Sequence, residues 1–167
     1  MNPLFPKKEY DSAYAVPYEK LYAEGIRGIV FDIDNTLVLP DAPSDLRSRE
    51  LFRRLHETGF RTCLVSNNSE RRVAPFADAV DSLYVYKAGK PFRRGFLKAL
   101  CLMKTERKNT VSVGDQLFTD IWGSNRAGIT PFLVKPMTKK EEIQIILKRI
   151  LEKPFLFIYH STREKNR

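Results

Sequence analysis

The chain has 167 residues, of which 43% are hydrophobic and 29% charged, and its formal net charge is +9. This length suits one domain with a buried core, and the composition is typical of a globular chain, not of a disordered or membrane-spanning one. The positive charge indicates an anionic partner, such as nucleic acid, an acidic lipid surface or a phosphorylated substrate. Two cysteines, Cys63 and Cys101, are too few for a disulfide framework, so we expect a cytoplasmic protein.

Helices and strands are predicted to alternate along the chain. The expected order is a helix at 17–25, a strand at 28–31, a helix at 45–58, a strand at 62–65, a helix at 69–79 and a short strand at 82–85. There follow a helix that Lys90-Pro91 opens, a strand at 110–113, a helix at 119–127, a strand at 131–134 and a last helix marked by Ile143, Ile146, Leu147, Ile150 and Leu151. This alternation predicts an α/β fold, a Rossmann-like three-layer sandwich with a mostly parallel sheet.

Polar side chains follow three of the predicted strands at the point where each strand ends. They are Asp32 and Asp34, then Ser66 and Asn67, and finally Asp115, while Lys90 opens the helix after the short strand. In an open α/β sheet, ligands bind beyond the carboxyl ends of the strands. We therefore expect these side chains to form one site.

Crowded carboxylates indicate a cation site. Asp32 and Asp34 are two residues apart, so in extended backbone their side chains leave the same side of the chain. Such carboxylates repel each other unless a divalent cation or a shared proton lies between them. Mg2+ fits this all-oxygen set better than Zn2+, because no His or Cys lies near the motifs. A Mg2+ site accepts phosphate oxygens, so a phosphoryl group is the expected ligand.

Two carboxylates and a cation suit phosphoryl transfer. One carboxylate can attack phosphorus to give an aspartyl-phosphate, and a second carboxylic acid can protonate the leaving oxygen and later activate water. We assign Asp32 as the nucleophile and Asp34 as the acid and base. The Ser66 hydroxyl and the N–H groups that follow it suit an anion, and Lys90 adds a point charge.

The motifs resemble those of the haloacid dehalogenase superfamily. Residues 32–37 (DIDNTL) are similar to its first motif, Ser66 to the second, Lys90 to the third, and Gly114-Asp115 with Asp120 to the fourth. The resemblance covers residues 26 to 134 and implies a Mg2+-dependent phosphatase. The phosphate-binding set that it implies is Thr36, Ser66, Asn67 and Lys90. The implied metal set is Asp32, Asp34 and Asp115, with the Asp34 backbone carbonyl as a ligand and Asp120 behind these ligands or as an alternative one.

More narrowly, the motifs resemble the YqeG-type class IIIA phosphatases, which are similar to phosphatidylglycerophosphate phosphatases. Superfamily members that act on small metabolites usually carry an inserted cap domain. Here 32 residues separate Asp34 from Ser66 and 24 separate Ser66 from Lys90, which leaves room only for a helix and a strand each time. We expect one capless domain over 1–167, with a motif core at about 26–134, a flank at 1–25, and a helix and basic tail at 135–167.

An uncapped site favours a large or lipid-linked phosphate, because bulk outside the site has to cover it. Basic clusters fit an anionic membrane surface, although they are also typical of a solvated helix. These clusters are Arg47, Arg49, Arg53, Arg54, Arg71, Arg72, Arg93 and Arg94, and in the tail Lys148, Arg149 and the residues around 155–159. We expect a cytoplasmic enzyme that can attach to the inner face of a membrane, with nucleic acid less favoured and the oligomeric state open. The alternatives are a phosphatase for phosphoprotein or nucleic-acid ends, and a non-catalytic scaffold that binds RNA or ribosomes.

Overall fold

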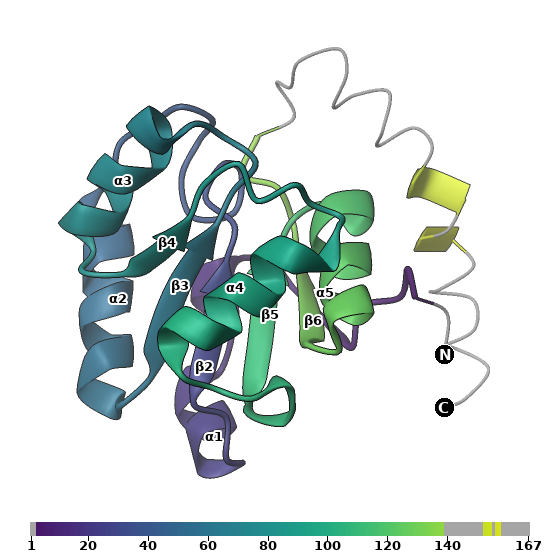
Figure 1. Ribbon diagram of the computed structural model, residues 1–167, viewed down its shortest axis with the longest axis horizontal. Helices are drawn as coiled ribbons and strands as arrows, with labels where there is room; N and C mark the ends of the chain where they lie inside the picture. The colour runs from purple at the N-terminus through teal and green to yellow at the C-terminus, as the bar shows by residue number, and fades with distance from the viewer. Residues whose placement is uncertain (1–2, 139–151, 155, 158–167) are drawn as a thin grey trace.

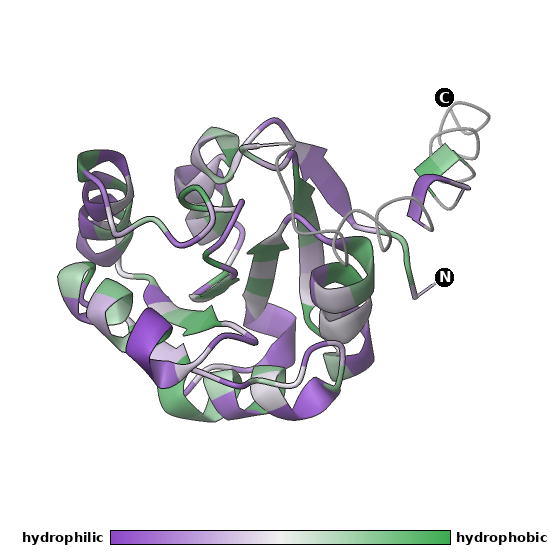
Figure 2. Cartoon of the chain, turned by 90° about the horizontal axis from the view of Figure 1, so that it is seen from above, coloured by the Kyte–Doolittle hydropathy of each residue, from purple (hydrophilic) through white to green (hydrophobic). Residues whose placement is uncertain are grey.

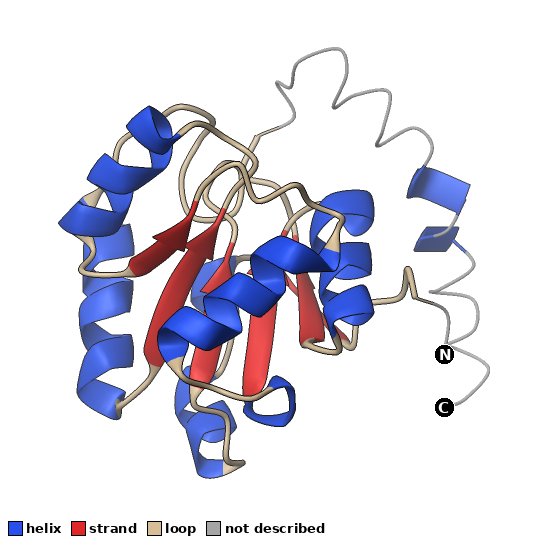
Figure 3. Ribbon diagram, viewed as in Figure 1, coloured by secondary structure: helices blue, strands red, loops and turns tan. Residues whose placement is uncertain are grey.

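Six parallel strands form a single sheet in a computed structural model that describes residues 3–138, 152–154 and 156–157 (Figures 1 and 3). The strands are β1 (Lys8–Tyr10), β2 (Gly28–Phe31), β3 (Arg61–Val65), β4 (Leu83–Val85), β5 (Thr110–Gly114) and β6 (Thr130–Val134). Their order across the sheet is β1-β6-β5-β2-β3-β4, and every neighbouring pair is parallel. The carboxyl ends of all six strands therefore lie at one edge, which we call the catalytic edge.

Helices cover both faces of the sheet and complete the predicted three-layer α/β fold. They are α1 (Tyr18–Ala23), α2 (Leu46–Thr58), α3 (Glu70–Ala79), α4 (Arg93–Met103) and α5 (Trp122–Ala127). Side chains of a strand alternate between its two faces, and β2 shows this directly. Ile29 and Phe31 belong to the core under α1, α2 and α3, whereas Val30 belongs to the core under α4 and α5.

Local sequence explains the best-predicted elements. The strand predicted at 28–31 is confirmed, because four consecutive buried residues suit the middle of a parallel sheet. The helix predicted at 45–58 is confirmed as α2, which Asp45 caps by accepting the backbone N–H of Ser48 at 2.7 Å. Gly59 ends α2 in the left-handed region with φ 104°, a conformation that costs glycine little. In Figure 2 the helices mix hydrophobic and hydrophilic residues, as amphipathic elements around a buried sheet should.

Two predictions about elements need correction, and one strand has no prediction. The helix at Lys90-Pro91 was placed too early, because the Phe92 N–H bonds the Gly89 carbonyl at 2.8 Å and closes a turn through these residues, so α4 begins at Arg93. The helix predicted at 119–127 is divided into a π-helical turn, η3 (Leu117–Ile121), and α5. The edge strand β1 was not predicted. The last predicted helix and most of the basic tail lie outside the described residues.

Two further observations bear on expectations from the sequence. Between Asp34 and Lys90 the chain forms only loops, α2, β3, α3 and β4, so the described structure has no inserted cap. No helix in the described ranges has the length and apolar character needed to cross a bilayer.

Candidate functional site

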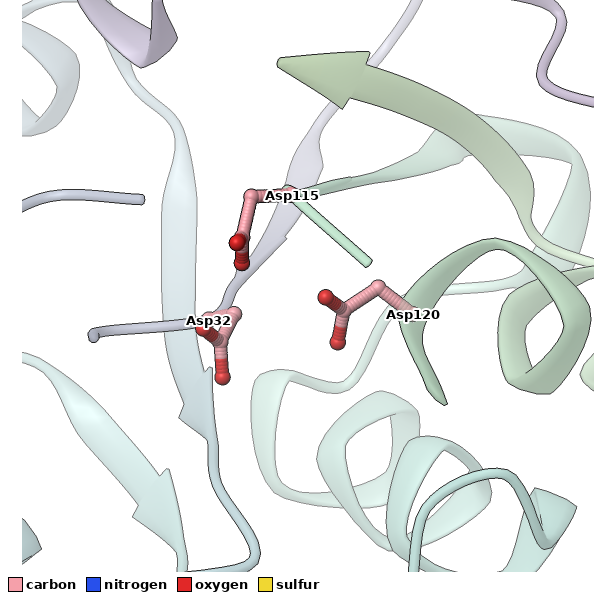
Figure 4. A group of neighbouring side chains, drawn as sticks. All are labelled: Asp32, Asp115 and Asp120. Carbon is pink, nitrogen blue, oxygen red and sulfur yellow. The ribbon is translucent and has the colours of Figure 1, made fainter. Parts of the chain in front are cut away.

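Three carboxylates meet at the centre of the catalytic edge (Figure 4). Asp32 follows β2, Asp115 follows the adjacent strand β5, and Asp120 lies in η3. Each offers a carboxylate oxygen, and these oxygens all lie within 4.8 Å of one another. Asp115 and Asp120 are buried and Asp32 is partly exposed, so Asp32 is the most accessible of the three carboxylates.

The backbone around Gly114 explains how Asp120 joins this cluster. A Cβ built at Gly114 would lie 2.5 Å from the Asp120 Cβ, a distance that real structures do not show. The π-helical turn then directs Asp120 inward, where its Oδ2 accepts the backbone N–H of Gln116 at 3.0 Å. Glycine at position 114 is therefore required for Asp120 to reach the other two carboxylates.

We predict that Gly114→Ala lowers the affinity for a divalent cation about 10- to 100-fold, because it would displace the carboxylate of Asp120 from the candidate cation site. Calorimetric titration with Mg2+ measures this affinity. Gly25→Ala is the control, since a Cβ at Gly25 meets nothing within 4 Å and strains only a left-handed position with φ 93°. Equal affinity in Gly114→Ala and in Gly25→Ala would contradict the role of Gly114.

Lys90 bridges two members of the carboxylate cluster. Its Nζ donates to Asp32 Oδ1 at 2.6 Å and to Asp120 Oδ1 at 2.6 Å, and only 5% of its side chain is exposed. Burial lowers the pKa of the Lys90 ammonium, but Asp120 and Asp32 outweigh this effect and raise it, so Lys90 stays charged. Three carboxylates and one ammonium leave negative charge in excess, which suits a divalent cation.

The pKa of Asp32 is also raised, but here burial is the main cause. Burial disfavours its ionised form and raises the pKa of this carboxyl to about 7, although Lys90 opposes the shift and Asp120 adds to it. A group that the fold keeps ready to gain or lose a proton near neutrality is typical of a reactive site. The all-oxygen donor set of Asp32, Asp115 and Asp120 fits a hard cation such as Mg2+, which would favour the ionised form of Asp32.

Two of the predicted phosphate-binding residues have different partners in the structure. Asn67 forms two hydrogen bonds with the backbone of Lys90: its Oδ1 accepts the Lys90 N–H at 2.7 Å and its Nδ2 donates to the Lys90 carbonyl at 3.1 Å. The second hydrogen of Nδ2 and the backbone N–H of Asn67 remain as donors, so its contact with a phosphate stays a prediction. The buried Thr36 hydroxyl lies 3.2 Å from Asp115 Oδ1 and 3.5 Å from Asp32 Oδ2, so it positions the carboxylates.

Ser66 is placed as expected, directly after β3 at the catalytic edge. Its Oγ accepts the N–H of Asn68 at 3.1 Å, and its backbone N–H donates to the Val85 carbonyl at 3.0 Å. These bonds fix the side chain and leave its hydroxyl proton for an acceptor such as a phosphate oxygen.

The Asp34 carboxylate is not one of the three that gather, and it has partners of its own. It is bound by Arg72, by Asn68 and by the backbone N–H of Asp41, none of which the sequence analysis linked to it. The carboxylates that gather are therefore Asp32, Asp115 and the predicted alternative ligand Asp120, without the side chain of Asp34. The Asp34 backbone carbonyl as a metal ligand stays a prediction. Arg72 had been noticed only as part of a basic cluster, since nothing in the sequence connects it to a residue 38 positions earlier.

Comparison with known proteins agrees with this geometry. A family model for haloacid dehalogenase-like hydrolases matches residues 41–128. Over 152 residues the chain is 35% identical to "Probable phosphatase YqeG" of Bacillus subtilis, and the match covers 90% of this chain and 88% of that protein.

Solved structures share the fold at low identity. The cobalt-bound deoxy-D-mannose-octulosonate 8-phosphate phosphatase of Haemophilus influenzae superposes with a TM-score of 0.55 at 10% identity, over 70% of this chain and 81% of that one. An uncharacterized protein of Listeria monocytogenes gives 0.53 at 17% identity, over 71% and 86%.

Proposed function

The chain belongs to the haloacid dehalogenase-like hydrolases and is a phosphatase, and we propose that it is Mg2+-dependent and hydrolyses an anionic lipid phosphate such as phosphatidylglycerophosphate. The residues available for each role support this proposal. Asp32, Asp115 and Asp120 would hold Mg2+, which when bound would neutralise charge on the carboxylates and on the phosphoryl oxygens. Lys90 and the Ser66 hydroxyl would hold the phosphoryl group.

Two carboxyl groups would carry out the chemistry. A carboxylate oxygen of Asp32 attacks phosphorus, the bond between phosphorus and the alcohol oxygen breaks, and that oxygen takes the proton of the Asp34 carboxylic acid. Water then attacks the same phosphorus and gives a proton to Asp34. The bond between phosphorus and Asp32 breaks, which releases inorganic phosphate and restores both side chains.

The composition and exposure of segment 86–94 are the main support for a lipid substrate. It surrounds Lys90 at the catalytic edge and contains four cations and no acidic residue. Five of its side chains are exposed, and they combine aromatic with basic character: Tyr86, Lys87, Phe92, Arg93 and Arg94. Phe92 is 64% exposed, an unusual position for a large apolar side chain beside a polar site.

Tyr86 and Phe92 are among several exposed apolar side chains that follow the carboxyl ends of the strands. Of the eight large hydrophobic residues that are exposed in the described part of the chain, five lie in loops that follow strands or in the first turn of a helix after such a loop. They are Leu39, Leu46, Tyr86, Phe92 and Met137. Apolar side chains with cations around an open site suit an anionic lipid surface, which offers both acyl chains and negative headgroups.

A substrate panel tests the proposal. Phosphate release is measured with Mg2+ or EDTA from phosphatidylglycerophosphate in vesicles, a phosphoserine peptide, a 5′-phosphorylated oligonucleotide and p-nitrophenyl phosphate. We expect the lipid to be preferred over the peptide and the oligonucleotide by at least about 10-fold in kcat/KM, with no release in EDTA. Preference for the peptide or the oligonucleotide would contradict the lipid substrate, and full release in EDTA would contradict the metal.

Removing the exposed groups of segment 86–94 should separate lipid turnover from the chemistry. Basic side chains contribute about 1 kcal/mol each at an anionic surface, so loss of Arg93 and Arg94 alone predicts about 30-fold weaker vesicle binding. We predict that the triple variant Phe92→Ser, Arg93→Gln, Arg94→Gln stays in the supernatant after sedimentation with phosphatidylglycerol vesicles. The ratio of lipid turnover to p-nitrophenyl phosphate turnover should fall with it.

The fold should tolerate this triple variant, because cations in the first turn of α4 oppose the helix dipole. Unchanged sedimentation and an unchanged turnover ratio would show that segment 86–94 does not contact lipid.

A further inference from the structure

Three donors hold the Asp34 carboxylate in place. Arg72 Nη2 donates to Oδ1 at 2.8 Å, Asn68 Nδ2 donates to Oδ2 at 2.7 Å, and the backbone N–H of Asp41 donates to Oδ1 at 3.0 Å. Both carboxylate oxygens therefore have defined partners, and the plane of the group is set. Oδ1 accepts two hydrogen bonds and Oδ2 only one, so the second lone pair of Oδ2 is the place for the proton of the acid form. Only Arg72 among the three donors carries a charge.

The ion pair between Arg72 and Asp34 is shielded from water. The Arg72 side chain is 15% exposed and the Asp34 side chain 21%, whereas five other ion pairs of the described chain, such as that of Arg54 with Glu19, have both partners more than half exposed. A shielded pair holds its geometry better than an exposed one, because water and salt screen it less.

The Arg72 guanidinium donates a hydrogen bond to Asp34 through Nη2, whereas its Nε has no such contact. Its Nε is buried and has no hydrogen-bond partner in the described residues, which is unfavourable for a donor. Its charged carbon lies 5.7 Å from the ring centroid of the buried Phe76. The fold thus leaves one donor unpaired while it directs another at a residue that the proposed chemistry needs.

The position of Arg72 in the chain connects two parts of the site. Arg72 lies in the first turn of α3, and the loop before α3 contains Ser66, which directly follows β3, and Asn68, which also binds Asp34. One segment therefore presents both the hydroxyl for the phosphate and the donors for the acid. A shift of this segment would move both groups together.

We propose that Arg72 is a positioning residue that orients Asp34 for proton transfer to the leaving alcohol. This inference rests on the proposed function, because it assigns a partner to the acid in that reaction. A general acid works only within hydrogen-bond reach of the oxygen that it protonates, and a misplacement of about 1 Å can cost about 100-fold in rate. Arg72 supplies that placement from a helix, which is more rigid than the loop that carries Asp34.

The choice of leaving group separates this role from a structural one. An alkyl alcohol leaves as a strong base and needs a proton, whereas p-nitrophenolate leaves readily without one. Loss of a positioning residue for the acid should therefore slow hydrolysis of an alkyl phosphate selectively. Loss of a residue that only stabilises the fold should slow both substrates alike.

The experiment compares glycerol 3-phosphate with p-nitrophenyl phosphate in the full-length protein at saturating Mg2+. For Arg72→Gln we expect kcat on glycerol 3-phosphate to fall about 100-fold, kcat on p-nitrophenyl phosphate to fall less than about 3-fold, and KM to change little for either. Arg72→Lys keeps the charge and should recover part of the loss. Arg71→Gln makes the same change at the exposed neighbouring position and should match the wild type.

Three results would overturn the inference. Equal losses on both substrates would make Arg72 structural, and an unchanged kcat on glycerol 3-phosphate in Arg72→Gln would remove its role. Failure of Arg72→Lys to exceed Arg72→Gln would show that the charged contact does not position Asp34. Release of phosphate from neither substrate by the wild-type protein would instead refute the proposed function.

Discussion

Asp32→Asn will lower phosphate release at least about 1000-fold and will make the metal-free protein more stable. Asparagine has the same shape but cannot attack phosphorus, so no covalent intermediate can form. The gain in stability follows from the pKa of Asp32, which burial raises from 3.8 to about 7 in the folded protein. Because the folded protein binds this proton more tightly than the unfolded chain, ionisation of Asp32 disfavours folding as the pH rises from about 4 to 7.

The advantage of the variant should therefore be small near pH 4 and full above pH 7. Thermal unfolding in EDTA across this range measures it, and saturating Mg2+ should remove it because Asp32 then has a counter-charge. Asp81→Asn is the control: Asp81 is exposed, with a left-handed backbone that asparagine also accepts. An Asp32→Asn protein that unfolds at a lower temperature than wild type at pH 8 in EDTA would refute this electrostatic picture of the cluster.

Lys90→Met will destabilise the metal-free protein by about 3–5 kcal/mol, the usual cost of breaking a buried ion pair by removing one partner. The Lys90 ammonium contacts Asp32 and Asp120 at 2.6 Å each, so its loss leaves two carboxylates without their shared cation. Protonation of Asp32 limits the loss at low pH, and the effect should be larger at pH 8 than at pH 5. Activity should fall at least about 100-fold, because the phosphoryl group also loses its cation.

Urea unfolding with and without Mg2+ measures this prediction. Mg2+ should stabilise Lys90→Met more than it stabilises the wild type, because the metal would supply the missing positive charge to the same carboxylates. Lys98→Met, an exposed position on α4, should behave like the wild type. Equal stabilisation of both proteins by Mg2+ would mean that Lys90 and the metal act on separate groups.

The sequence predicted the fold where short-range signals and burial agree. The strand β2 is a run of four buried residues, and α2 lies between a capping Asp45 and a stopping Gly59. The edge strand β1 carries no such signal, because its residues Lys8–Tyr10 are only half-buried and two of the three are charged. The start of α4 was misplaced because a turn through Lys90 precedes the helix.

The sequence predicted those site residues that directly follow a strand. Parallel strands bring Asp32, Ser66 and Asp115 to one edge, and their spacing along the chain reveals this. The sequence predicted Asp120 only as a residue behind the ligands or as an alternative ligand, because its close approach depends on the π-helical turn and on the missing side chain of Gly114. The orientation of Asp34 depends on Arg72, which is distant in sequence, and no local pattern records such a pairing.

Chemical trapping of the intermediate on Asp32 tests the account most directly. The wild-type protein is mixed with substrate and Mg2+, quenched in acid during turnover, and treated with borohydride, which reduces an acyl phosphate to an alcohol. Mass spectrometry of the peptide that contains residue 32 should then show homoserine in place of Asp32, with no such product from Asp32→Asn. Release of phosphate with Asp32 unmodified, or reduction at another carboxylate, would contradict the assignment of Asp32 as the nucleophile.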